Sequence, residues 1–211
     1  MKATMISINP QWVEKILSGE KTIEVRKTKP KLETPFKCYI YCTKQGKVFF
    51  HGGIGEKQVL FRNPDTNKIK FDYAFELMCC ENKYTENNFL SGKVVGEFVC
   101  DWIEEFVPTQ KGIMFKRFSS LHDTGLSLDE IKQYSNGKNV FGWHISELKV
   151  YDVPKELKEF ETPCTCTGEY EGSTYSDCLF CDKAGDSDYG IIACDRKVKR
   201  PPQSWVYVEE I

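Results

Sequence analysis

Hydrophobic residues near the start of the chain change their spacing twice, and each spacing predicts a different element. Residues 4–8, Thr-Met-Ile-Ser-Ile, predict a short strand. Asn9 can then cap a helix with Pro10 at its first position, and the apolar residues recur at i, i+1, i+4 and i+5 as far as Ser18. Gly19 supplies the left-handed backbone that ends helices. The apolar face of this helix, which we expect to pack on the core, consists of Trp12, Val13, Ile16 and Leu17.

From residue 22 the spacing has a period of two, which is typical of a strand. The apolar face of this strand consists of Ile23 and Val25. Its polar face consists of Thr22, Glu24 and Arg26. Because Lys21 lies at the turn just before, an ammonium, a hydroxyl, a carboxylate and a guanidinium fall within one patch. This patch is the best candidate for a functional site.

The rest of the chain is richer in strands than in helices, which predicts an α+β fold. Ser127 and Glu130 have the spacing of a capping box, so a helix is expected over 127–134, closed by Asn136 and Gly137. The polar segment 63–88 predicts a variable loop or an extra hairpin. Further strands are expected at 37–43, 47–51, 93–102, 113–118, 140–151 and 204–209.

Length and composition fit one domain over residues 1–211, with a Cys-rich excursion at 161–200 before the final strand. Hydrophobic residues make up 40% of the chain, which is enough to fill a core. The N-terminus lacks a signal-like apolar run, and no stretch approaches the roughly 18 apolar residues of a membrane helix. We therefore expect a cytoplasmic protein with no membrane partner.

The net charge of -2 argues against a general polyanion binder, since non-specific affinity for nucleic acid needs an excess of cations. Any contact with nucleic acid must therefore be local. A local concentration of cations exists at Arg26, Lys27, Lys29 and Lys31, within a stretch that contains no acid. A solvated basic loop is the alternative interpretation of this stretch.

Residues 19–26, Gly-Glu-Lys-Thr-Ile-Glu-Val-Arg, fill every position of the G-x-K-x-x-E-x-R signature of ASCH domains, a branch of the PUA-like superfamily. The segments 141–145 (Phe-Gly-Trp-His-Ile) and 201–205 (Pro-Pro-Gln-Ser-Trp) resemble small stand-alone ASCH proteins of bacteria and phages. The resemblance covers 1–53, 91–160 and 200–211. It implies a PUA-like pseudobarrel of five or six mostly antiparallel strands with two or three short helices. It also implies a cleft that binds RNA or a modified nucleoside.

In such a binding module Lys21 would contact a phosphate or carbonyl, and Arg26 a phosphate or base edge. Glu24 would accept a hydrogen bond from a base amino group, with Thr22 beside it. Trp143 or Trp205 would stack on a base. Trp143 and His144 are neighbours on one strand and face opposite ways, so at most one of them lines any one surface. The alternative is an ordinary ion-pair cluster on a barrel rim, worth about 0.2–1 kcal/mol per pair.

Some ASCH proteins are amidohydrolases that deacetylate N4-acetylcytidine through a Lys, a Thr and a distant Glu. Lys21 matches this set, but Glu24 stands at the Thr position, and the distant acid falls near Thr124, with Asp123 beside it. An ammonium is a poor nucleophile, yet Lys21 can polarise a carbonyl while Glu24 positions water. Whether the chain is an enzyme stays open, with binding the favoured interpretation.

The excursion holds a C-x-C pair and a C-x2-C pair, which have the ligand number of a tetrahedral zinc site. The pairs are Cys164 with Cys166 and Cys178 with Cys181. Free thiols are the favoured interpretation, because C-x-C is less regular and no His lies nearby. A zinc-stabilised excursion would offer a docking surface for a protein partner. No cofactor is required for the binding function.

Overall fold

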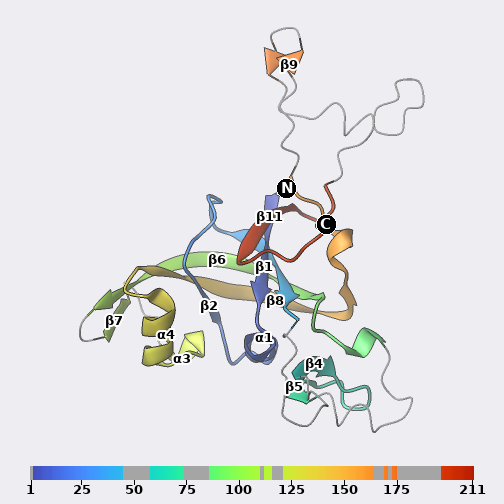
Figure 1. Cartoon of the computed structure of the whole chain (residues 1–211), viewed down its shortest axis with the longest axis horizontal. Helices are drawn as coiled ribbons and strands as arrows, with labels where there is room; N and C mark the ends of the chain where they lie inside the picture. Colours follow the sequence, from blue (N-terminus) through green and yellow to red (C-terminus); the bar gives the residue numbers. More distant parts are fainter. Residues whose placement is uncertain are drawn as a thin grey trace, which may run out of the picture.

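A strongly bent, mostly antiparallel sheet forms the centre of the computed structural model (Figure 1). The structure describes residues 2–44, 58–73, 86–109, 112–115, 121–163, 169–170, 173–174 and 196–211. Six strands follow one another in the order β11-β1-β3-β6-β8-β2, and β7 pairs with β6 beyond them. All pairs are antiparallel except β1 with β3. The predicted α+β class is confirmed. The strands are β1 (Lys2–Ile8), β2 (Ile23–Arg26), β3 (Phe36–Cys42), β6 (Val94–Thr109), β7 (Gly112–Phe115), β8 (Val140–Lys155) and β11 (Trp205–Glu209).

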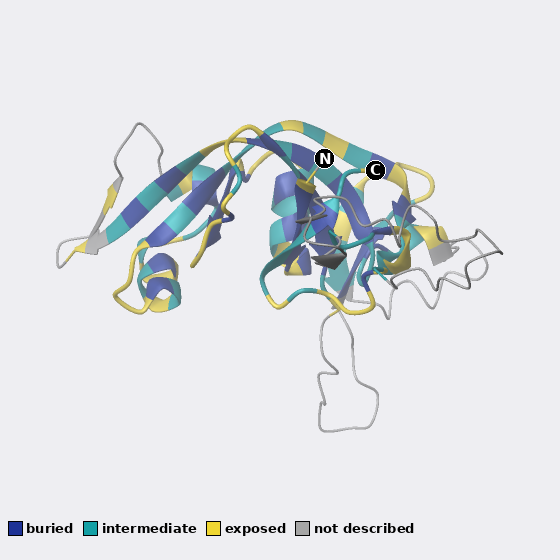
Figure 2. Cartoon of the chain, turned by 90° about the horizontal axis from the view of Figure 1, so that it is seen from above, coloured by how far each residue is buried: buried dark blue, intermediate teal, exposed yellow. Residues whose placement is uncertain are grey.

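β6 and β8 are the longest of the described elements, with 16 residues each, and they arch across the molecule as one ribbon (Figure 2). Their register shifts between Val94 and Gly96, between Glu97 and Val99, and between Cys100 and Ile103. Such irregularities bend a strand pair and increase its twist. At Gly96 a Cβ atom would lie 2.5 Å from the carbonyl oxygen of Lys149, so glycine permits this close approach.

Three α-helices lie among the described residues, and the two longer ones begin as the sequence predicts. In α1 (Pro10–Leu17) the side chain of Asn9 accepts a hydrogen bond from the Gln11 N–H at 3.3 Å. Gly19 follows this helix with φ +82°. In α4 (Leu128–Ser135) the Ser127 and Glu130 capping box is formed, and left-handed Asn136 ends the helix. The short α3 (Leu121–Thr124) lies next to α4 (Figure 1).

Two small hairpins of the described chain lie outside the main sheet. β4 (Gln58–Arg62) pairs with β5 (Ile69–Tyr73), and β9 (Glu169–Tyr170) pairs with β10 (Ser173–Thr174). The first hairpin contains the turn of the predicted loop or hairpin at 63–88, but its first strand begins earlier than predicted. Single 3-10 turns lie at Glu86–Asn88 and Leu157–Glu159. The strand expected at 47–51, the end of the one expected at 113–118, and the four cysteines of the proposed zinc site lie outside the described residues.

The main core lies between the sheet and α1 and includes Ile8, Val13, Ile40, Phe98 and Trp143.

None of the described helices is both long enough and apolar enough to cross a membrane.

Side-chain contacts draw the two ends of the sheet, β2 and β11, towards each other. Trp205 Nε1 donates to the hydroxyl of Thr28, just after β2, at 3.0 Å. The Lys31 N–H donates to the hydroxyl of Tyr207 at 2.7 Å. Arg26 at the end of β2 donates to the carbonyl oxygen of Ser7 in β1 at 2.6 Å. The sheet therefore curls into the pseudobarrel that the sequence resemblance implies.

Candidate functional site

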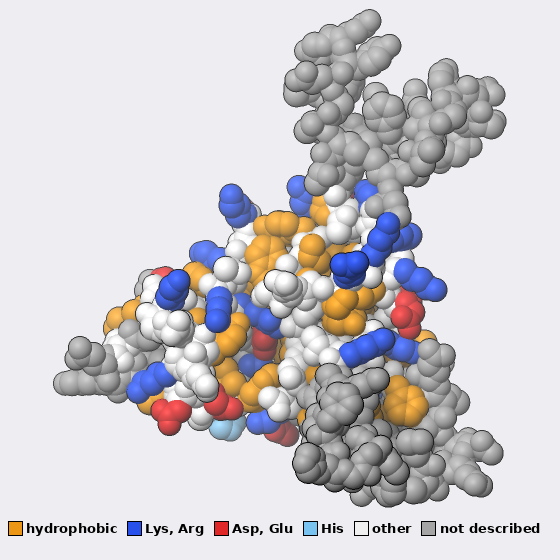
Figure 3. All heavy atoms as spheres, in the orientation of Figure 1, with side chains coloured by type: hydrophobic (Ala, Val, Ile, Leu, Met, Phe, Trp, Pro, Cys, Tyr) orange, Lys and Arg blue, Asp and Glu red, His pale blue; other side chains and the backbone are white. Residues whose placement is uncertain are grey.

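A pocket of about 190 Å³ lies where β1, α1 and β2 meet, with Leu126 and the α4 residue Tyr134 beside it. The view of this face in Figure 3 shows a hollow with acidic and basic side chains near its centre and lysine and arginine side chains around it. Ten residues line the pocket. They are Ser7, Ile8, Asn9, Trp12, Lys21, Glu24, Val25, Arg26, Leu126 and Tyr134. Three of the predicted site residues, Lys21, Glu24 and Arg26, are thus brought together here.

The turn that carries Lys21 is fixed between α1 and α3. The Lys21 N–H donates to the carbonyl oxygen of Lys15 at 3.0 Å, and the Thr22 N–H donates to that of Asp123 at 2.9 Å. Beyond the turn, Ile23 and Val25 pack in a core cluster with Phe106 and its neighbours under α4. Because side chains alternate along a strand, this packing directs Glu24 and Arg26 towards the pocket.

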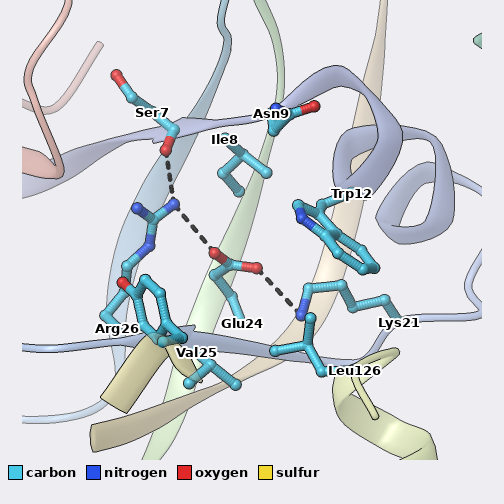
Figure 4. Close-up of a pocket in the computed structure, with 10 residues that line it drawn as sticks. Ser7, Ile8, Asn9, Trp12, Lys21, Glu24, Val25, Arg26 and Leu126 are labelled. Atoms are coloured by element: carbon cyan, nitrogen blue, oxygen red, sulfur yellow. Dashed lines mark hydrogen bonds and ion pairs between the residues drawn. The ribbon is translucent and has the colours of Figure 1, made fainter. Parts of the chain in front are cut away.

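The Glu24 carboxylate lies between the two cations (Figure 4). Its Oε2 is 3.2 Å from Lys21 Nζ, and its Oε1 is 3.0 Å from Arg26 Nη2. The residues are 2%, 6% and 8% exposed for Lys21, Glu24 and Arg26. They therefore form a buried charge cluster, not the exposed rim cluster that was the alternative interpretation of this segment.

The Lys21 ammonium has three hydrogen-bonding partners. Besides Glu24, it donates to the carbonyl oxygens of Ile23, at 2.7 Å, and of Thr124. An ammonium has three N–H donors, so all of them are engaged. Burial lowers the pKa of Lys21 from its ordinary value, and the charge of Glu24 only partly offsets this effect. Even so, the three contacts hold Lys21 Nζ as a hydrogen-bond donor.

Two polar atoms of residues that line the pocket have no hydrogen-bond partner among the described residues. They are Arg26 Nε and the hydroxyl oxygen of Ser7, and both residues are more than nine-tenths buried. The Ser7 hydroxyl points away from the charge cluster, whereas the Ser7 carbonyl oxygen faces Arg26 (Figure 4). A buried donor that stays unsatisfied costs about 1–3 kcal/mol. An incoming ligand with a hydrogen-bond acceptor would remove that cost at Arg26.

Aromatic side chains provide the apolar part of the pocket. Trp12 lies beside Lys21, whose Nζ is 5.7 Å from the centre of the ring. Tyr134 lies on the α4 side, and the ammonium of the exposed Lys27 is 4.9 Å from its ring centre. Lys27 thus brings the basic segment after β2 to the edge of the pocket.

The other predicted site residues lie outside this pocket. The side chain of Thr22 is exposed. Trp143 is fully buried, with its ring edge-to-face against Phe36 at 5.7 Å. Trp205 is half-buried, and its N–H is used in the contact with Thr28. Their roles in ligand binding remain predictions.

The position expected for a distant catalytic acid is occupied by the buried Thr124. Its carbonyl oxygen accepts the hydrogen bond from Lys21, and its hydroxyl donates to the carbonyl oxygen of Leu121 at 2.7 Å. The neighbouring Asp123 contributes its main-chain carbonyl to Thr22. Residues 123–124 therefore contact the segment that carries Lys21 through main-chain carbonyl oxygens.

Sequence reasoning did not select Ser7, Leu126 or Tyr134, and it placed Trp12 only on the core face of its helix. Trp12 packs against the main core and lines the pocket as well. The three others carry no motif, and only the tertiary fold brings them to the signature segment. Among the described residues no group of three or more His, Cys, Asp or Glu side chains is arranged to hold a metal ion.

Comparison of the chain with models of protein families found no match, and comparison with the sequences of characterised proteins found none either. Among solved structures, the fold is similar to the crystal structure of ASCH from Zymomonas mobilis. The TM-score is 0.48 at 14% sequence identity, and the similarity covers 99% of this chain and 88% of that one.

Proposed function

We propose that this chain is an ASCH-type binding module that holds one base of an RNA or of a nucleotide-like ligand in the pocket beside β2. The observation that carries the proposal is the buried cluster of Lys21, Glu24 and Arg26, which opens into a pocket. There Arg26 Nε has no partner in the part of the chain that the structure describes. Burying charged groups is costly because they lose their hydration, and a perturbed, buried charge cluster in a pocket is characteristic of functional sites.

The size and lining of the pocket favour a single ring system. Sites for drug-sized ligands have volumes of roughly 300–1,000 Å³, and this pocket has about 190 Å³. Trp12 and Tyr134 offer aromatic surface for a planar ring, and Glu24 and Arg26 offer an acceptor and a donor for its edge. Unstacked bases are recognised by this combination of aromatic contact and edge hydrogen bonds.

The cations around the pocket favour a ligand that carries phosphate. Lys27 contacts Tyr134, and Lys29 lies over the ring of Phe141 at 5.5 Å. Lysine ammonium groups at the edge of a base pocket can neutralise a neighbouring phosphate, and this contact would weaken as salt is added.

A second candidate function, hydrolysis of the acetyl amide of N4-acetylcytidine, is favoured by the lowered pKa of Lys21. A neutral amine is the form that can attack a carbonyl. Against it stands the geometry, because all three donors of the ammonium are engaged. As a nucleophile, Lys21 would have to lose a proton and release at least one of these partners.

The binding function is tested by titrating labelled single-stranded RNA with the full chain and following fluorescence anisotropy. Arg26→Met should weaken binding by about tenfold or more, because a charge-assisted hydrogen bond is worth about 1.5–3 kcal/mol. The variant keeps a neutral Lys21–Glu24 pair and should fold. Lys2→Met, at the exposed start of β1, is the matched control and should leave affinity unchanged. Equal affinity of the two variants would contradict the proposal.

The hydrolase candidate is tested by incubating the chain with N4-acetylcytidine and separating any cytidine released. We expect no turnover. Turnover that disappears in Lys21→Met would make the protein an amidohydrolase.

A further inference from the structure

The carboxylate of Glu24 is held from two sides and still has hydrogen-bonding capacity. Lys21 contacts one oxygen and Arg26 the other, at 3.2 Å and 3.0 Å. An ionised carboxylate has about four acceptor sites on its two oxygens. Each oxygen can therefore accept one more hydrogen bond, and a ligand with two adjacent N–H donors can pair with both at once.

Of the two cations that hold this carboxylate, only Arg26 keeps a buried donor for a ligand. Lys21 has no N–H left, because Glu24, Ile23 and Thr124 engage all three. Arg26 retains Nε, which is buried and has no partner among the described residues. We therefore expect the ligand to carry a hydrogen-bond acceptor. This acceptor should lie next to the ligand N–H that pairs with the Glu24 oxygen on the Arg26 side.

The charge of the cluster restricts the ligand further. Lys21 and Arg26 supply two positive charges and Glu24 one negative charge, and Lys15 adds a further repulsive charge near Lys21. Like charges in a buried site repel strongly. Protonated bases and guanidinium groups are therefore disfavoured, and the two adjacent donors must belong to a neutral ring.

Guanine is the unmodified neutral base that has this edge. Its N1–H and N2–H2 lie side by side, and its O6 acceptor is next to N1. Adenine and cytosine present one amino group beside an acceptor nitrogen, whose lone pair would face the second carboxylate oxygen. Uracil presents one N–H between two acceptors. We propose that the pocket selects guanine, with N1–H and N2–H donating to Glu24 and O6 accepting from Arg26. The inference rests on the proposed function of this site.

The test uses the native full chain and a set of nucleosides, so it does not depend on the folding of a variant. Guanosine should bind at least about tenfold more tightly than inosine, which lacks the N2 amino group and would leave one Glu24 oxygen without its hydrogen bond. N1-Methylguanosine, which lacks the N1–H, should lose at least as much. 7-Deazaguanosine keeps the whole edge and is the matched control, with affinity equal to that of guanosine.

The outcomes separate this inference from the proposed function. If inosine, cytidine, adenosine or uridine binds as tightly as guanosine, the guanine preference is overturned and base binding stands. If none of the nucleosides binds, the proposed function is overturned as well. Chemical shift titration detects binding over the wide affinity range that single nucleosides require.

Discussion

At the scale of single residues, the proposed site consists of three charged side chains that the fold buries together. Lys21, Glu24 and Arg26 are each less than a tenth exposed. Removing one member of a buried ion pair leaves a charge without compensation, which is more costly than the pair itself is favourable. Glu24 is the member that both cations share, so the cluster should depend on it most.

Glu24→Gln should lower the free energy of unfolding by about 3–5 kcal/mol, because two cations would remain buried without a counter-charge. Urea denaturation followed by circular dichroism measures this value. Glu20→Gln, an exposed carboxylate in the same turn, is the control and should change stability by less than about 0.5 kcal/mol. Equal effects of the two variants would show that the cluster is solvated.

The lowered pKa of Lys21 predicts a pH dependence with a definite sign. In the unfolded chain this lysine titrates at its ordinary value of 10.5, and in the folded chain at a lower pH. Between the two values the unfolded state binds more protons, so the stability contributed by Lys21 should rise with pH and level off above 10.5.

Lys21→Met lacks this titration and provides the reference for the pH series. The difference in unfolding free energy, native minus variant, should therefore increase as the pH approaches 10.5 from below. A difference that decreases over the same range would mean that Glu24 raises the pKa of Lys21 more than burial lowers it.

At the scale of elements, the bent β6–β8 ribbon and the short β2 strand position the site. Glu24 pairs in register with Trp143 of β8, so the course of β8 determines where the carboxylate lies. The bend of β8 depends in turn on its register shifts with β6. Close backbone approach at Gly96 is one requirement of that bend.

Gly96→Ala should lower the free energy of unfolding by about 1–3 kcal/mol, the usual cost of forcing an extra methyl group into a packed position. The added Cβ would meet a backbone carbonyl oxygen at 2.5 Å, and backbone cannot rotate away as a side chain can. Thermal unfolding measures the loss. Gly137→Ala is the comparison variant. A Cβ at position 137 would lie in open space, but the backbone there has a φ of +73°, so this variant introduces backbone strain without steric overlap.

At the scale of the whole molecule, contacts between the segment after β2 and β11 close the pseudobarrel beside the site. Trp205 and Tyr207 of β11 hold Thr28 and Lys31 by one hydrogen bond each. Tyr207→Phe removes the second and should cost about 0.5–1.5 kcal/mol in urea denaturation. An unchanged stability would mean that this contact contributes nothing to closure.

The local parts of this architecture could be predicted from the sequence, because neighbouring residues determine them. The Asn9 cap, the left-handed Gly19, the capping box at Ser127 and the period of two around Glu24 are all of this kind. The same holds for the proximity of Lys21, Glu24 and Arg26, which share one short segment.

The burial of the cluster could not be predicted, because it depends on residues far along the chain. One carbonyl oxygen that accepts a hydrogen bond from Lys21 belongs to Thr124, 103 residues away, and Tyr134, which also lines the pocket, belongs to α4. Neither carries a motif. The full length of β6 and β8 was missed for a related reason, since bulges interrupt the alternation that marks a strand.

The most direct test of the central claim, that a base occupies the pocket beside β2, uses the indole N–H signals of the four tryptophans. Trp12 lines the pocket, whereas the exposed Trp102 lies on β6 outside it. In a 1H–15N spectrum, with signals assigned by Trp12→Phe and Trp102→Phe, each of the four ribonucleosides is titrated in turn. The account predicts that at least one shifts the Trp12 signal in a saturable way and leaves Trp102 unchanged. A Trp12 signal that stays still with all four would contradict it.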